Sequence, residues 1–247
     1  MNPESRPYHS IVWSFPATAV LGALLCACAT TLPADGAGAP DVRAGDTWTY
    51  NVIEENFADS EAKRFEYSLT RTVERVADRE IEVSDDRVGC PSCKQKRKFD
   101  LTWGLIQAPG SDGRAIVFSP HRPALIFPLT AGRSWIENYT WQTQGETVWS
   151  DLQANGKVVG SEETHVPAGT FRTLEVELLT AVTFGPRKRA IFVQPKDRGG
   201  TQELYWYAPP IKNFVKYMIK VYKDRNLVAQ TTWELANYRI NAGVSVP

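Results

Sequence analysis

The sequence is poor in the residues and motifs on which much enzyme chemistry depends. Its 247 residues include four cysteines and three histidines. It has no G-x-S-x-G turn, which would expose a serine nucleophile. It also has no H-E-x-x-H pair for zinc and no glycine-rich phosphate-binding loop. These absences remove the usual machinery of a hydrolase, and we expect no catalytic residue, no resident metal and no cofactor.

A net charge of either sign is also absent. Lys and Arg together number 28, as do Asp and Glu, so the formal net charge is zero. Nucleic-acid-binding domains carry a basic excess, and we therefore do not expect nucleic acid as a partner. The same balance gives no reason to expect strong attraction to anionic lipid surfaces.

Long apolar runs are absent except near the N-terminus. Residues 1–10 are polar and include Arg6, and the segment from Ile11 to Leu25 has no charged side chain. Small residues follow. A charged start, an apolar centre and a small-residue end are the order of a secretory signal peptide. We predict a signal peptide over residues 1–27 and an oxidising compartment for the mature protein.

The sequence LCAC at residues 25–28 resembles the lipobox of bacterial lipoproteins. Leu25 stands three residues before Cys28, a small residue precedes Cys28, and Cys26 fills the tolerant middle position. The resemblance implies cleavage before Cys28 and acyl chains on its thiol and amine. More than one chain is needed for stable anchoring. Because Ala29 rather than aspartate follows, the resemblance implies the outer membrane, with the protein on its periplasmic side.

Two other interpretations of the N-terminus remain open. The run from Ile11 to Ala29 is long enough to span a bilayer as an uncleaved helix. An ordinary signal could instead be cut nearby and release a soluble protein. In the lipoprotein interpretation, residues 28–41 are a lipidated cysteine followed by a tether rich in Ala, Gly and Pro. Such a tether reaches roughly 20 Å as a flexible coil.

Alternating apolar and polar residues dominate the chain after the tether. TWTYNVI places Trp48, Tyr50 and Val52 on one face, and RFEYSLTRTV, FVKYMIKVY and LVAQTTWEL alternate in the same way. A period of two marks half-buried strands, and a polar second face suits antiparallel sheets. Turn signals, among them VADRE at 76–80 and KDRN at 223–226, separate the runs.

These patterns predict an all-β, mainly antiparallel fold with little helix. Two arrangements remain open, a curved sheet and two packed β-meanders. In the second arrangement, residues 42–126 form a first β half and residues 127–247 a second half packed on it. We expect at most a short helix, near Ala108–Pro123, and the lack of βαβ alternation argues against a parallel-sheet enzyme.

A short internal repeat supports two related halves. AGDTW at residues 44–48 recurs as AGRSW at residues 131–135, and each copy opens a long predicted strand. Self-similarity at a fixed offset is the signature of a repeated structural unit. Five residues can also recur by chance, so the repeat is a hypothesis at this point.

Three segments of the second half resemble a family. FPLTAGRSW (127–135), THVPAGTFRTLEVE (164–177) and LYWYAPPIKNFVKY (204–217) occur in that order. Over residues 127–240 they resemble the TapB-like and related uncharacterised β-rich envelope proteins of bacteria. The resemblance implies a β scaffold, with a turn at PAGTF before a long strand and a strand beginning near VKY. It implies no known activity.

The strongest local motif is GCPSCK, which holds Cys90 and Cys93. In an oxidising compartment the simplest interpretation is a disulfide that closes a surface turn. A redox-active dithiol is the alternative, because basic neighbours such as Lys94 favour the thiolate. Thioredoxin-like chemistry, however, places such a pair in a βαβ context, which the chain lacks.

The same cysteine pair could also belong to a metal or haem site. Zinc needs two further ligands, and the mature chain offers His121 and His165 besides carboxylates. CPSCK resembles a variant of the C-x-x-C-H haem-attachment motif in which lysine replaces histidine. His121 falls in a proline-rich stretch that we expect to be a loop, and His165 lies beside a turn. We expect both histidines to be solvated.

Three further features have simple structural explanations. Glu162 and Glu163 are adjacent, so on a strand they point to opposite faces and form no acid pair. The basic run at 187–189 is expected to be a hairpin tip, although it could meet an anionic partner. LYWYAPP could line a ligand groove, but we expect Trp206 in the core, with Tyr205 and Tyr207 on the other sheet face.

The sequence thus predicts an exported, lipid-anchored β protein that serves as a non-catalytic binding or assembly module of the bacterial envelope. Its partners are the membrane, through the lipid on Cys28, and an envelope protein or lipid. A lipid or hydrophobic-ligand carrier and a thiol-disulfide oxidoreductase using Cys90 and Cys93 are the alternatives.

Overall fold

The structure is a computed structural model, and it describes residues 36–58, 62–110, 112–147, 149–183 and 199–241. The predicted signal peptide, Cys28 and most of the tether lie outside these residues, as does the basic run at 187–189. None of the helices in the described ranges is long and apolar enough to cross a membrane.

The described residues form twelve strands and two short 3₁₀ helices. The strands are β1 (Thr47–Asn56), β2 (Lys63–Ala77), β3 (Glu80–Arg87), β4 (Gln95–Asp100), β5 (Leu105–Pro109), β6 (Ala115–Arg122), β7 (Ser134–Thr143), β8 (Trp149–Val166), β9 (Gly169–Thr183), β10 (Gly199–Ala208), β11 (Asn213–Lys223) and β12 (Asn226–Arg239). The 3₁₀ helices are η1 (Pro91–Cys93) and η2 (Pro209–Ile211).

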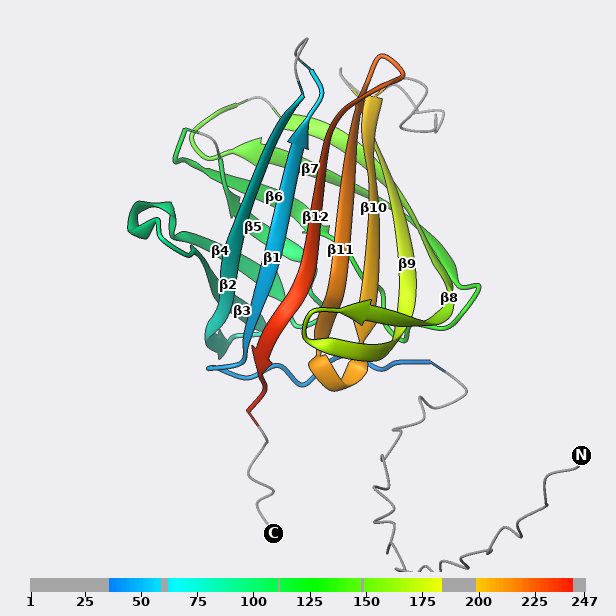
Figure 1. Cartoon of the computed structure of the whole chain (residues 1–247). Coiled ribbons are helices and arrows are strands. Elements are labelled where there is room, and N and C mark those ends of the chain that lie inside the picture. The colour runs from blue at the N-terminus through cyan, green and yellow to red at the C-terminus, as the bar shows by residue number, and fades with distance from the viewer. Residues whose placement is uncertain (1–35, 59–61, 111, 148, 184–198, 242–247) are drawn as a thin grey trace, which may run out of the picture. The chain divides into compact units, whose positions relative to one another are not determined.

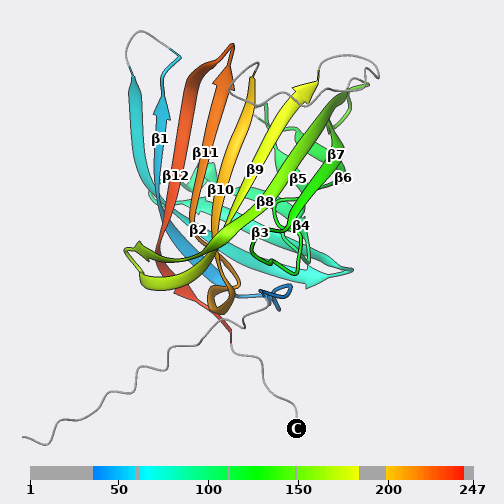
Figure 2. The same cartoon turned by 90° about the vertical axis from the view of Figure 1, so that its right-hand side faces the viewer.

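All twelve strands belong to one closed antiparallel barrel (Figures 1 and 2). Each strand pairs with its neighbours in the sequence, and β1 pairs with β12 to close the ring. The all-β prediction is therefore confirmed. Of the two arrangements left open, the structure shows the curved sheet, and the two halves of the chain meet edge to edge within it.

The alternation in the sequence sets which side chains point inward. Trp48, Tyr50 and Val52 are all buried, as the period of two predicts, and so are Val215 and Leu235 on the opposite end of the chain. Since successive side chains of a strand point to opposite faces, the intervening polar residues lie on the outer surface.

The predicted turns are also present. Asp78 and Arg79 connect β2 to β3, and Asp224 and Arg225 connect β11 to β12, all four with positive φ. Two-residue hairpins with a type I′ turn have positive φ at both positions, because that turn matches the twist of the strands. The PAGTF turn before a long strand is found as well, between β8 and β9.

The short helix predicted near Ala108–Pro123 is wrong, because this segment forms β5 and β6 instead. Its residues include the β-branched pair Ile116 and Val117, which favour strands. Its prolines have no N–H and fit helix interiors poorly. A glycine turn separates the two strands, so no uninterrupted helical run remains.

The internal repeat is confirmed as a structural repeat. AGDTW forms a turn that leads into β1, and AGRSW forms the same turn leading into β7. The glycines of the two copies, Gly45 and Gly132, have φ of +85° and +83°. A positive φ at one position of each turn explains why glycine occupies it.

The two copies also make the same contacts. Gly45 N–H donates to the carbonyl of Val73, and Gly132 N–H donates to the carbonyl of Val158, both at 2.8 Å. Immediately after each of these valines the strand register shifts by a β-bulge, in β2 and in β8. Each half therefore begins with the same turn, strand and bulged strand.

One end of the barrel is closed by side chains, which we call the floor. The Trp48 indole N–H donates to the carbonyl of Ile211, and the Trp103 indole N–H donates to that of Lys212, both at 2.9 Å. The two indoles meet edge to face, with ring centroids 5.7 Å apart. Leu129 is also fully buried, and its backbone pairs with that of Ala37 through two hydrogen bonds.

A buried carboxylate fastens three segments beneath the floor. Asp46 has no exposed surface, and its oxygens accept hydrogen bonds from the backbone N–H of Arg43 and of Asn241, at 3.0 and 2.7 Å. The Lys212 ammonium lies 3.2 Å from the same carboxylate. The segment before β1, the loop after η2 and the end of β12 are thereby held together.

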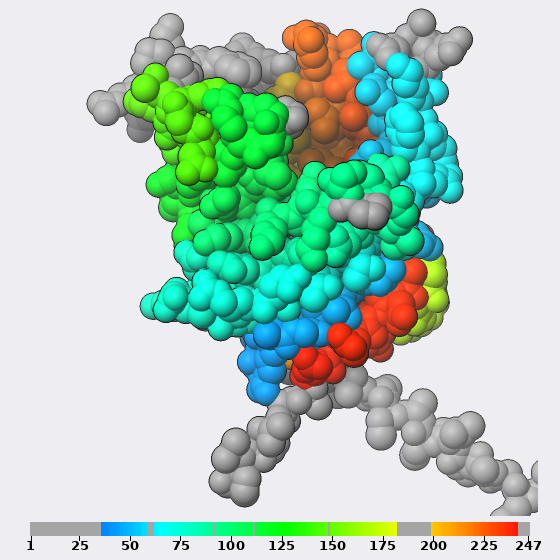
Figure 3. All heavy atoms as spheres, turned by 90° about the vertical axis from the view of Figure 1, so that its left-hand side faces the viewer, coloured from blue at the N-terminus to red at the C-terminus, as the bar shows by residue number. Residues whose placement is uncertain are grey.

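The barrel wall is uneven in height. β8 and β9 have 18 and 15 residues, whereas β4 and β5 on the other side have six and five. A strand rises about 3.3 Å per residue, so the wall is lower where β4, β5 and β6 stand. Figure 3 shows a hollow on this side, with the orange strands at its back.

The packing of Trp135 on Gly156 yields a prediction about stability. The two residues pair directly across β7 and β8, and a β-carbon on Gly156 would overlap the Trp135 ring. Gly156→Ala should lower the free energy of unfolding by about 1–3 kcal/mol, because it overpacks the interior. Urea unfolding followed by circular dichroism measures this change.

Gly160 on the same strand is the matched control, because a β-carbon there meets nothing within 4 Å. Gly160→Ala should leave stability unchanged or raise it by up to about 1 kcal/mol. Equal effects of the two substitutions would contradict the packing described here.

Candidate functional site

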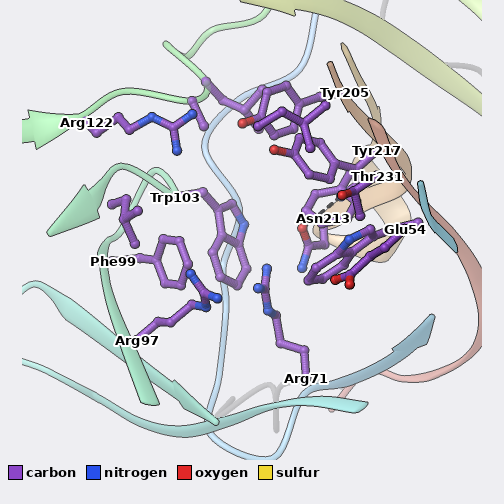
Figure 4. Close-up of a pocket in the computed structure, with 16 residues that line it drawn as sticks. Glu54, Arg71, Arg97, Phe99, Trp103, Arg122, Tyr205, Asn213, Tyr217 and Thr231 are labelled. Carbon is purple, nitrogen blue, oxygen red and sulfur yellow. Dashed lines mark hydrogen bonds between the residues drawn. The ribbon is translucent and has the colours of Figure 1, made fainter. Parts of the chain in front are cut away.

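A cavity lies inside the barrel above the floor. Eight-stranded barrels are just wide enough to be filled by side chains, and diameter grows with strand number, so twelve strands leave space. The cavity has a volume of about 280 Å³. Aromatic side chains and three arginines line most of it: Phe99, Trp103, Tyr205, Phe214, Tyr217, Trp233, Arg71, Arg97 and Arg122. Figure 4 shows the three arginines together with Phe99, Trp103, Tyr205 and Tyr217.

Two of these arginines share one buried carboxylate. Arg71 binds Asp85 with Nε and Nη2, each 2.8 Å from a carboxylate oxygen. Arg97 Nε donates to Asp85 Oδ2 at 2.9 Å. Strands β2, β3 and β4 supply the three residues, which neighbour one another in the sheet. Two guanidinium groups and one carboxylate leave one positive charge uncompensated within the cluster.

The arginines keep Asp85 ionised despite its burial. Burial by itself raises the pKa of a carboxyl group, but the attraction and hydrogen bonds of Arg71 and Arg97 outweigh it and hold the Asp85 pKa below its usual value. Burial is also the main reason that the pKa of Arg97 is lowered. An arginine stays charged nonetheless.

A second buried cluster lies across the cavity. Glu203, which has no exposed surface, pairs with Arg122. Its Oε2 accepts hydrogen bonds from the hydroxyls of Tyr205 and Tyr217, at 2.6 and 2.9 Å. Burial and the Glu203 charge raise the pKa of both tyrosines well above its usual value. Burial opposes ionisation of Glu203, but Arg122 and the two hydroxyls lower its pKa.

The guanidinium group of Arg71 is surrounded by aromatic rings. Its Cζ lies 5.4 Å from the centre of the Trp233 ring, 5.5 Å from Phe99 and 6.0 Å from Phe214. Cation–π attraction acts within about 6 Å and is stronger when the cation is desolvated. The rings therefore hold Arg71 in place and also provide flat apolar walls.

Glu54 brings a carboxylate to the cavity lining as well. It accepts a hydrogen bond from the Tyr67 hydroxyl at 2.6 Å. In the β1–β2 register, Trp48 pairs with Arg71 while Glu54 pairs with Phe65. Six residues of strand separate the two levels, which is roughly 20 Å. Glu54 thus stands toward the mouth of the barrel, far from the floor.

Cys90 and Cys93, predicted as a disulfide or a redox pair, form a disulfide across η1, between β3 and β4. The neighbouring Lys94 lies 3.3 Å from Asp86 and 3.6 Å from Glu74. These carboxylates offset the positive charge that would lower a thiol pKa. The pair lies apart from the cavity lining. The surroundings agree with a disulfide that closes a turn.

The structure does not bring the two described histidines together. His121 lies on β6, not in a loop as predicted, with Nδ1 3.2 Å from Asp100. His165 lies on β8 with Nδ1 2.8 Å from the Thr170 hydroxyl. Among the residues that the structure describes, no three His, Cys, Asp or Glu side chains are placed to hold a metal ion.

The two adjacent glutamates face different neighbours, as expected for a strand. The Trp206 indole N–H donates to Glu162, and Glu163 lies 3.5 Å from His165. The expectation that Trp206 is in the core is wrong. Tyr205 and Tyr207 point inward and are buried, whereas Trp206 lies on the outer face and is only partly buried.

Sequence analysis missed the charged residues of the interior, although a signal exists. Arg71 stands between Leu69 and Val73 on the predicted apolar face, and Asp85 continues the face of Ile81 and Val83. A charge at a period-two apolar position predicts a buried charge that needs a partner. Arg97 and Glu203 stand in the same way, two residues before Phe99 and Tyr205.

The chain is similar to three solved structures. A candidate lipoprotein from Parabacteroides distasonis is 13% identical over 83% of this chain and 100% of its own, with a TM-score of 0.44. The hypothetical lipoprotein YmcC from Escherichia coli is 10% identical over 78% of this chain and 84% of its own, also with a TM-score of 0.44. A candidate exported protein with a YmcC-like fold, from Bacteroides fragilis, is 14% identical over 82% and 99%, with a TM-score of 0.42.

No family model matches the chain, and no curated protein matches it. The resemblance of residues 127–240 to TapB-like proteins and the lipobox at Cys28 therefore stay predictions.

The lowered pKa values of Asp85 and Glu203 predict how stability depends on pH. A carboxyl group whose pKa falls on folding stabilises the protein above its unfolded pKa, about 4. That contribution is lost as the pH falls through the folded-state pKa. The free energy of unfolding should therefore decrease as the pH is lowered from 5 toward 2, as measured by urea unfolding at each pH.

Asp85→Asn tests the assignment to this residue. It should cost about 3–5 kcal/mol at neutral pH, because the buried Arg71 guanidinium and the partly buried one of Arg97 lose their anion, and it should flatten the acid limb of the profile. Asp224→Asn, in an exposed turn with a positive φ that asparagine tolerates, should leave the profile unchanged. Parallel profiles for wild type and Asp85→Asn would show that the cluster does not carry the dependence.

Proposed function

We propose that the protein is a non-catalytic ligand-binding module of the bacterial cell envelope, with its binding site inside the barrel. The observation that carries the proposal is the cavity of about 280 Å³ above the floor. Small-molecule sites are concave, mainly apolar and equipped with a few fixed polar groups. Their volumes start at roughly 300 Å³, so this cavity suits a small ligand or one end of a larger one.

The polar groups of the cavity are fixed in place, which suits binding. Arg71 is held by Asp85, and Arg122 is held by Glu203. Side chains held by their neighbours lose little conformational entropy when a ligand binds, and such preorganisation favours affinity.

The protonation states around the cavity support a role without catalysis. A general base or acid works best with a pKa near the operating pH. Arginine keeps its proton in proteins, and the pKa values of Tyr205 and Tyr217 are raised well above the usual value. These groups hold their protons at neutral pH, so they can donate hydrogen bonds but do not exchange protons with a ligand.

The alternatives from the sequence fit this site unequally. A carrier of a lipid or hydrophobic ligand is one form of the proposed function, because the rings of the cavity provide apolar surface. A thiol-disulfide oxidoreductase gains no support from the surroundings of Cys90 and Cys93, where carboxylates offset the charge of Lys94.

The envelope location rests on the N-terminal sequence. We propose that residues 1–27 are removed, that Cys28 carries acyl chains, and that the tether ending at residue 41 holds the barrel on the periplasmic side of the outer membrane. The membrane is then a partner through the lipid. An envelope protein or a lipid is the second proposed partner.

The proposed cavity ligand predicts extra mass on the native protein. Full-length protein purified from its own envelope in mild detergent should carry a small molecule in native mass spectrometry, and denaturation should release it. Thr231 lines the cavity, so Thr231→Phe should fill part of the space and lower the bound fraction.

Thr232 is the matched control, because it follows Thr231 on β12 and successive side chains of a strand point to opposite faces. Thr232→Phe should retain the ligand. Protein that carries no small molecule, or that loses it equally in both variants, would rule out the cavity as the binding site.

The proposed anchor predicts a second mass. Under denaturing conditions the envelope-extracted protein should have the mass of residues 28–247 plus acyl chains, because cleavage and acylation occur at Cys28. Cys28→Ala should abolish the acyl mass and release the protein from the membrane fraction. A wild-type protein without acyl mass would refute the anchor while leaving the cavity proposal intact.

A further inference from the structure

We infer that the ligand of the barrel cavity is a small organic anion, with a carboxylate or phosphate group near the floor and an apolar ring or chain above it. The inference rests on the proposed binding function and names its ligand class. Four features of the cavity support it: an unpartnered donor, an uncompensated positive charge, the placement of the carboxylates and the aromatic walls.

The unpartnered donor is the side-chain amide of Asn213. This residue lines the cavity and is only 2% exposed. Its Oδ1 accepts a hydrogen bond from the backbone N–H of Phe214 at 2.8 Å, whereas its Nδ2 has no partner. A buried donor left unpaired costs about 1–3 kcal/mol. A ligand with an acceptor oxygen at this position removes that cost.

The uncompensated charge belongs to the cluster of Arg71, Arg97 and Asp85. Two of the three side-chain nitrogens of Arg71 donate hydrogen bonds to Asp85, and Nε of Arg97 donates to the same carboxylate. The third nitrogen of Arg71 still carries two N–H groups. An anion that accepts from it balances the second guanidinium, and guanidinium groups match the oxygens of carboxylates and phosphates geometrically.

The carboxylates are placed so that they do not compete with such a ligand at the floor. Among the described residues that line the cavity are Arg71, Arg97 and Arg122, but neither Asp85 nor Glu203. The two acids therefore lie in the wall behind the arginines that they fix. Glu54 does line the cavity. Along β1, however, Glu54 lies six residues, or roughly 20 Å, from the position that pairs with Arg71. The cluster of Arg71, Arg97 and Asp85 gives the floor a net positive charge. Arg122 is balanced by Glu203, and Glu54 carries negative charge toward the mouth.

The remaining lining sets the body of the ligand. Trp103, Trp233 and Phe214 present ring faces and edges, and burying apolar surface against them contributes about 25 cal/mol per Å². A free inorganic anion would leave these walls without a partner. A neutral apolar molecule would leave the Asn213 amide and the extra guanidinium charge without one. An anion attached to an apolar body satisfies both regions.

The test compares matched anionic and neutral probes by isothermal titration, with the full chain freed of copurified ligand. The probes are 4-phenylbutyrate, phenyl phosphate and the neutral 4-phenylbutanol, with inorganic phosphate to test the head group alone. At least one organic anion should bind about tenfold or more tightly than 4-phenylbutanol, since hydrogen bonds to charged groups are worth about 1.5–3 kcal/mol. Inorganic phosphate should bind weakest of the anions.

Two variants assign the effect to the floor. Asn213→Asp keeps the size and the acceptor oxygen but removes the Nδ2 donor and adds negative charge, so it should weaken anion binding at least tenfold. Arg97→Gln removes the extra positive charge while Arg71 still pairs with Asp85, so it should also weaken anion binding at least tenfold. It provides the test if Asn213→Asp does not fold. Asn237 is exposed, and its Oδ1 likewise accepts a hydrogen bond from the backbone N–H of the next residue, at 2.8 Å. Asn237→Asp is therefore the matched control.

The outcomes separate this inference from the proposed function. If neither 4-phenylbutyrate nor phenyl phosphate binds more tightly than 4-phenylbutanol, or if anion binding survives both floor variants, the anionic ligand is overturned and a cavity-binding protein remains. Tight binding of inorganic phosphate alone would overturn the apolar body. If no probe binds and the native protein carries no extra mass, the proposed function itself fails.

Discussion

The pairing of β1 with β12 is the constraint on which the rest of the structure depends. These strands come from the two ends of the described chain, yet they pair antiparallel from Thr47 with Arg239 to Asn56 with Ala229. Their pairing leaves neither strand as an open edge, which would otherwise attract other strands. It also turns one face of the sheet into an enclosed interior. Twelve strands make that interior too wide for side chains to fill, so the cavity is a consequence of closure.

The interior combines charges and aromatic rings in an arrangement that explains why the cavity stays polar in places. An isolated buried guanidinium group would be very costly, and Arg71 and Arg122 each have a carboxylate in the wall behind them. The acids hold the arginines, the arginines keep the acids ionised, and the rings around Arg71 hold its position. Removing one member leaves the others without compensation, which is why we treat each cluster as a unit. What remains facing the cavity is a set of fixed donors beside apolar surface.

Several elements were predictable from local pattern. The inward face of Trp48, Tyr50 and Val52, the two-residue turn at Asp78 and Arg79, and the repeated turn before β1 and β7 all depend on residues close in sequence. The predictions were wrong where the local pattern of residues is compatible with two structures. Trp206 was assigned to the core because LYWYA is aromatic at successive positions, so alternation cannot tell which face is inside. The helix near Ala108–Pro123 was expected because most globular proteins contain some helix. The residues of this segment themselves show no helical periodicity.

Most strands, the turns and the face that each side chain shares could be predicted from the sequence, because they follow from neighbours along the chain. The strands β5 and β6 were not predicted, and Cys90 and Cys93 were left open between a disulfide and a redox pair. Arg71 and Glu203 also stand at period-two apolar positions, but the prediction did not use that signal. The partners of those charges depend on how the chain folds. Glu203 pairs with Arg122, 81 residues away in the sequence, and Asn213 reaches the same cavity as Arg71. Such contacts depend on barrel closure and strand register, which bring distant strands together and which no local period specifies.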